Sequence, residues 1–155
     1  MNEPSSLLLA ISEQTVRIKD TAEGLIRQLP LEVQCGLWDQ TTPVSPSMRR
    51  ALGDFTQALV AATTDTDELF SRLCLWMEKH PEAELLFSLD EALSSYSLLR
   101  RSVGDAMNEA TTLGLHRESQ EENLFPLLRT LRALCQNAED FSLLLRSTLE
   151  QAKTV

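Results

Sequence analysis

Residues able to carry out chemistry are few in this chain, and their spacing fits no metal or redox site. The chain has two histidines, His80 beside a proline and His116 shortly after a glycine, both at expected helix ends. A di-iron site in a helical bundle needs Glu-x-x-His twice, and that pattern is absent. Cys35, Cys74 and Cys135 are far apart and form no Cys-x-x-Cys pair. We therefore expect no metal and no cofactor.

Motifs for covalent catalysis and for phosphate binding are also missing. No serine lies in a Gly-x-Ser-x-Gly turn, which exposes the nucleophile in many hydrolases. The five glycines are scattered singly, so they form no glycine-rich phosphate loop. With no readable constellation of nucleophile, base and oxyanion donor, the sequence predicts a protein that is not an enzyme.

The net charge of −9 opposes attraction to the phosphates of nucleic acids and to anionic lipid headgroups. Two arginine pairs, Arg49–Arg50 and Arg100–Arg101, keep DNA binding as an alternative. Helices over 47–63 and 66–79 with a short break would imitate a helix-turn-helix. The second of them would, however, begin with two acidic residues, the wrong charge for the tip that enters the groove.

The elements that would position any site are helices, because apolar residues recur at alternating intervals of three and four. This spacing keeps side chains on one face of a 3.6-residue helix. The clearest such run is Leu89, Ala92, Tyr96, Leu99, Val103, Ala106, Ala110 and Leu113. The sequence predicts an all-α bundle of about five helices, over 5–29, 47–63, 66–79, 89–113 and 119–152.

The last two helices should form a long antiparallel hairpin, because only residues 114–118 connect 89–113 to 119–152. The capping pair Ser119 and Glu122 is typical of a helix start, but Pro126 lies past the first turn of such a helix, which leaves open a kink there or a start near Leu124. The helix over 119–152 carries two adjacent apolar stripes, so we expect at least two neighbouring helices to pack on it. A second copy of the chain could provide one of them, so a homodimer stays open.

We expect one domain over residues 1–155, with an irregular connection at 30–46 that contains three prolines and a glycine. The sequence leaves open whether the first helix packs on its own chain or on another. No apolar run approaches the roughly 20 residues of a membrane span, and the N-terminus lacks the basic segment of a signal peptide. Together with unpaired cysteines, these features favour a cytoplasmic protein.

Surface recognition is the function that remains. We expect a non-enzymatic protein–protein interaction module, such as a chaperone, adaptor, inhibitor or regulator, that binds a helix or a basic segment of another protein. A DNA-binding or transcription-linked regulator is the first alternative, and a small-ligand-binding helical bundle is the second. Aromatic and methionine side chains are enriched at interfaces, although burial in the protein's own core is their commoner fate. The candidate partner-binding residues are Leu37, Trp38, Met48, Trp76 and Met77.

Overall fold

The computed structural model describes residues 3–35, 41–82, 86–115 and 121–152. Four long helices and one short helix make up nearly all of this part, together with two strands of two residues each. In chain order the elements are α1 (Glu3–Gln28), α2 (Leu31–Gln34), β1 (Thr42–Pro43), α3 (Pro46–Lys79), α4 (Leu86–Gly114), β2 (Glu121–Glu122) and α5 (Phe125–Ala152).

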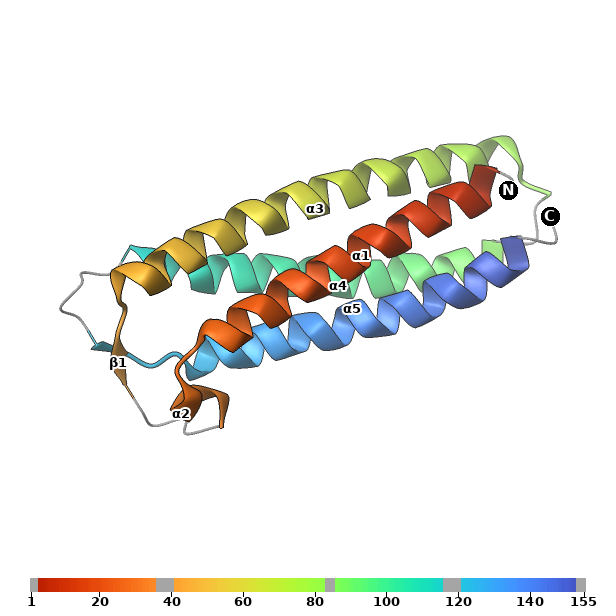
Figure 1. Cartoon of the computed structure of the whole chain (residues 1–155). Helices are drawn as coiled ribbons and strands as arrows, with labels where there is room; N and C mark the ends of the chain where they lie inside the picture. Colours follow the sequence, from red (N-terminus) through yellow and green to blue (C-terminus); the bar gives the residue numbers. More distant parts are fainter. Residues whose placement is uncertain (1–2, 36–40, 83–85, 116–120, 153–155) are drawn as a thin grey trace.

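The four long helices form an antiparallel bundle in which each helix packs on two others (Figure 1). Helix α1 lies against α3 and α5, and α4 lies against the same two helices. Successive helices run in opposite directions, so α1 begins at the end of the bundle where α5 finishes. The prediction of an all-α bundle with a long C-terminal hairpin is confirmed, with α4 and α5 as adjacent antiparallel helices.

The core consists of the apolar stripes that the sequence displays. The apolar residues that recur every three or four positions from Leu89 to Leu113 are all buried. Three aromatic rings fix the centre of the bundle: Phe70 of α3 stacks on Tyr96 of α4 with ring centroids 4.3 Å apart, and Phe141 of α5 lies 5.3 Å from Tyr96. Such ring pairs add to the free energy gained from burial alone.

The wide apolar face of α5 is covered within one chain. Its two stripes include Leu127, Leu131 and Leu134, all fully buried. Helix α1 packs along one side of α5 and α4 along the other. The first helix therefore packs on its own chain, and the face of α5 needs no second copy to exclude water.

The two connections at one end of the bundle are joined to each other. Strand β1 pairs antiparallel with β2, and Thr42 faces Glu122 in the ladder. Val44 and Leu124 follow these strands, and both are fully buried. The irregular segment 30–46 thus carries α2 and β1 and ties the α1–α3 hairpin to the α4–α5 hairpin.

Helix α3 is continuous, so the expected break between 47–63 and 66–79 is wrong. Thr66 is 0% exposed, and its hydroxyl donates to the carbonyl of Ala62 at 2.7 Å. Asp65 lies 4.0 Å from Arg17 of α1 rather than capping a new helix. Threonine and aspartate favour helix N-caps, but here the Thr66 hydroxyl has its hydrogen-bond partner within α3 and the Asp65 carboxylate lies near a cation of α1.

Helix α5 begins later than the sequence indicates. Glu122 lies in β2 instead of in the first turn of a helix, and Ser119 lies outside the described residues. The side-chain oxygen of Asn123 accepts from the backbone N–H of Phe125 at 2.9 Å. Pro126 follows in the first turn, where a proline sacrifices no intrahelical hydrogen bond.

The continuity of α3 predicts that Thr64→Pro destabilises the protein by about 3 kcal/mol, because proline in a helix interior removes a hydrogen bond and clashes with the preceding turn. Thr64 is exposed, so Thr64→Ala is the matched control and should change stability little. Urea unfolding of both variants measures the difference. A loss below about 1 kcal/mol for the proline variant would instead favour an interrupted helix.

Candidate functional site

The candidate residues from the sequence do not gather at one place. Leu37 and Trp38 lie outside the described residues. Met77 is 5% exposed and belongs to the core, whereas Met48 and Trp76 are partly buried and pack against it. Met48 and Trp76 lie near opposite ends of α3, about 42 Å apart at the rise of an α-helix.

Trp76 lies in a hollow at the C-terminal end of α3. Its indole stacks on the imidazole of His80 with centroids 4.3 Å apart, and the His80 Nδ1 lies 2.9 Å from the Trp76 carbonyl oxygen. The hollow has a volume of about 200 Å³ and is also lined by Arg72 and Lys79. Leu75 borders it and reaches a larger groove on its other side.

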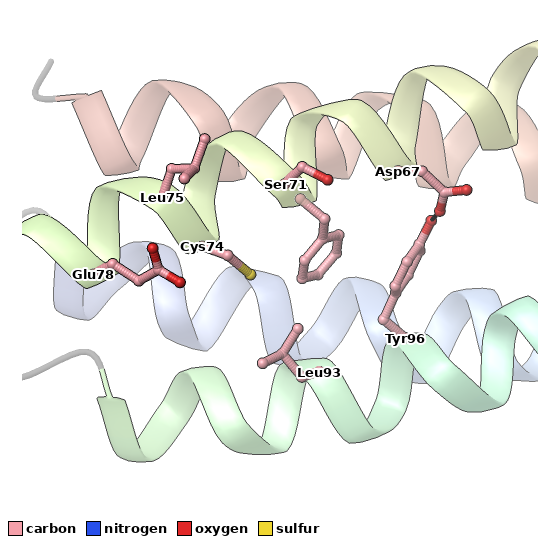
Figure 2. A pocket seen from close by; sticks show the side chains of 8 residues that line it. Asp67, Ser71, Cys74, Leu75, Glu78, Leu93 and Tyr96 are labelled. Carbon is pink, nitrogen blue, oxygen red and sulfur yellow. Dashed lines mark hydrogen bonds between the residues drawn. The ribbon is translucent and has the colours of Figure 1, made fainter.

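That larger groove runs between α3 and α4 and has a volume of about 560 Å³ (Figure 2). These two helices pack less closely than the other adjacent pairs of the bundle. The side chains lining the groove come from about three turns of α3 and one turn of α4. They are Asp67, Phe70, Ser71, Cys74, Leu75 and Glu78 from α3, with Leu93 and Tyr96 from α4.

The sequence of α3 explains why a groove forms here. Phe70, Leu73 and Met77 occupy the stripe that faces the core. The groove positions beside that stripe include Ser71 and Cys74, whose short side chains fill little of the space between the two helices. The apolar floor therefore stays accessible to solvent instead of being sealed.

One end of the groove is closed by a polar network that joins α3 to α4. The hydroxyl of Tyr96 donates to Asp67 Oδ1, and Arg100 Nε lies 3.2 Å from the same oxygen. Burial raises the pKa of Tyr96 well above its usual range, and the hydrogen bond to the Asp67 carboxylate raises it further. The carboxylate of Asp67 is therefore held by two donors and is partly neutralised by one of them.

Cys74 lies in the middle of the groove as a protonated thiol. Burial raises its pKa, and the nearby carboxylate of Glu78 raises it further. The thiolate is the nucleophilic form of cysteine, so this environment works against reactivity. Figure 2 shows the Glu78 carboxylate on the same side of α3 as the Cys74 sulfur.

The remaining charge of the groove is acidic. None of the eight lining residues is a cation. Among the described residues, Arg100 pairs with Asp67, whereas Glu78 has no cation within 4.0 Å. The arrangement can therefore bind an apolar group on its floor and a positive group at Glu78.

The groove could not be located from the sequence, which places none of its lining residues among the candidates. Phe70 is indistinguishable from any other core residue by its spacing, and Tyr96 lies within the clearest apolar run. One signal was present in Leu75, a large apolar residue that falls outside the core stripe of α3 and is 55% exposed. Isolated exposed leucines are common, however, and only a neighbouring helix turns one into the wall of a groove.

The described residues contain no group of three histidine, cysteine or acidic side chains arranged to hold a metal ion. No helix among them combines the length and the apolar character that crossing a bilayer requires.

Comparison of the chain with protein families, with curated proteins and with solved structures found no match.

The Tyr96 network predicts an alkaline titration that can be followed directly, because Tyr96 is the only tyrosine in the chain. Tyrosinate absorbance of the folded protein should appear well above pH 10, about where an ordinary tyrosine ionises. The folded state keeps the phenolic proton to a higher pH than the unfolded state does. The resulting stabilisation is fully present below about pH 10 and is lost as the pH rises beyond it.

Asp67→Asn is the matched variant for this titration. It removes the carboxylate but keeps the size of the side chain, so the pKa of Tyr96 should fall yet stay above its usual range, because burial is the larger cause. An ordinary titration in the folded wild type, with tyrosinate formed at about pH 10, would contradict the network.

Proposed function

We propose that this protein is a non-catalytic helical module that binds another protein, and that the α3–α4 groove receives an apolar helix face of that partner. The observation that carries the proposal is Leu75, a large apolar side chain that stands 55% exposed at the edge of an apolar floor. Two antiparallel helices flanking such a floor form the surface on which amphipathic helices dock.

The chemistry of the groove supports binding over catalysis. Cys74 carries a raised pKa, and none of the eight lining residues is a histidine or a cation that would stabilise its thiolate. Tyr96 is likewise held in its protonated form by burial and by Asp67. A chaperone, adaptor, inhibitor or regulator needs neither group to ionise.

A small-ligand-binding bundle is the second candidate, and the groove volume favours it. About 560 Å³ falls within the range of roughly 300–1,000 Å³ that small-molecule pockets occupy. Such pockets enclose most of their ligand, whereas this groove lies open along the surface between two helices. A partner that brings its own apolar face covers an open groove more completely.

The DNA-binding alternative loses its structural basis in this region. The arginine pairs that suggested it remain, but its helix-turn-helix form needs a turn between two helices at 64–67, and α3 runs through that segment without interruption. Asp67 and Glu68 are thus in the middle of a long helix, and they are among the 23 acidic residues that give the chain its net charge of −9.

We also propose a cytoplasmic location. Cys35, Cys74 and Cys135 are all free thiols, and Cys35 is exposed. Free exposed thiols are typical of proteins kept in a reducing compartment.

Leu75→Gln tests the proposed function, because it replaces the exposed apolar wall by a polar side chain of similar length. Leu98→Gln is the matched control: Leu98 is 54% exposed on α4 and does not line the groove. We expect a protein captured from the native host by wild type and by Leu98→Gln to be depleted roughly tenfold with Leu75→Gln, the size of effect that a lost interface anchor produces. Quantitative mass spectrometry of the captured proteins measures the ratio.

Calorimetry should then show that the captured protein binds purified wild type directly. The affinities of wild type, Leu98→Gln and Leu75→Gln should rank in the same order as the amounts captured. Equal capture by all three proteins would show that the groove is not the binding surface.

A further inference from the structure

We infer that the occupant of the α3–α4 groove is a basic amphipathic helix, one that places an apolar side chain on the floor beside Cys74 and a lysine or arginine against Glu78. This inference rests on the proposed function and adds the chemistry of the partner. Its basis is that the open part of the groove combines apolar contact with one uncompensated negative charge.

The two carboxylates of the groove differ in whether they are paired within the protein. Asp67 accepts from Tyr96 and pairs with Arg100, so its charge is already engaged inside the protein. Glu78 lies exposed at the other end of the groove, and the described residues supply no cation within 4.0 Å of it. A partner that brings a positive charge to Glu78 gains attraction without breaking an existing pair.

Two more exposed acidic residues follow Glu78 along the chain. Asp90 lies exposed on α4 one turn before Leu93, and Glu82 lies exposed just beyond the end of α3. The cations of this part of α3, Arg72 and Lys79, line the hollow beside Trp76 on the other side of Leu75. The net charge of −9 adds long-range attraction for a basic partner.

The position of Glu78 fixes the spacing expected in the partner. Glu78 lies one helical turn beyond Cys74 and lines the same groove, and Figure 2 shows its carboxylate on the same side of α3 as the Cys74 sulfur. On a docked helix, residues three or four positions apart lie one above the other. An apolar anchor over Cys74 therefore has its lysine or arginine three or four positions away.

Other occupants fit less well. An acidic helix would bring a carboxylate against Glu78 in a groove without a free cation among its lining residues. A second copy of this chain would bring another body of charge −9 to the same surface. The basic helix is the one occupant that satisfies both the floor and the charge.

Two synthetic helical peptides test the inference with the full chain. Both carry the same leucine stripe; one has lysines beside the stripe and the other has glutamates at the same positions. We expect the lysine peptide to bind wild type and to bind Glu78→Lys roughly tenfold more weakly, as reversal of a close charge pair implies. The glutamate peptide should prefer Glu78→Lys over wild type. Fluorescence anisotropy of labelled peptides measures all four affinities.

Glu68→Lys is the matched control for net charge. Glu68 is exposed on the same helix and does not line the groove, so its replacement changes the total charge equally without touching the site. The lysine peptide should bind this variant as it binds wild type. Equal weakening by Glu68→Lys and Glu78→Lys would overturn the inference, because diffuse charge alone would then explain the preference.

The rate of alkylation of Cys74 shows whether a bound peptide lies in the groove. Peptide in the groove should slow modification of Cys74 several-fold, while the exposed Cys35 provides an internal control in the same sample. If both peptides protect Cys74 with equal affinity, the groove receives helices as proposed and the basic preference is wrong. If neither peptide binds or protects Cys74, the groove is not a helix receptor, and the proposed function fails with it.

Discussion

Exclusion of water from the apolar face of each of four antiparallel helices is the constraint that determines this structure. Burial of each leucine-sized side chain contributes about 1.5–3 kcal/mol, so the stripes fix which face of every helix points inward. Polar residues inside the stripes are tolerated where their hydroxyls find a partner nearby. Thr15, for example, donates to the carbonyl of Ile11 at 2.8 Å in the core.

The groove is a local consequence of the same packing. Phe70, Tyr96 and Phe141 are large, and their stacked rings hold α3, α4 and α5 together at the centre of the bundle. Farther along α3, Ser71 and Cys74 are too small to fill the space that these rings impose. An apolar floor therefore stays open between the two helices.

The two ends of the groove differ in charge. Asp67 is engaged with Tyr96 and Arg100 at one end, which leaves Glu78 as the accessible charge at the other. The thiol of Cys74 between them is held protonated by burial and by Glu78. These charges and the apolar floor are the features on which we base the proposal of a helix with an apolar face and a positive flank.

The sequence by itself determined the all-α class, the inward stripes and the α4–α5 hairpin, because helical periodicity and a short connection are local properties of the chain. It placed Met77 and Trp76 together as surface candidates, although only their neighbours decide that Met77 faces the core. Tertiary structure alone decided that α3 continues through Thr66, that α1 covers α5, and that Leu75 borders a groove. Each of these depends on which helix lies alongside, and contacts between residues distant in the chain leave no periodic trace in the sequence.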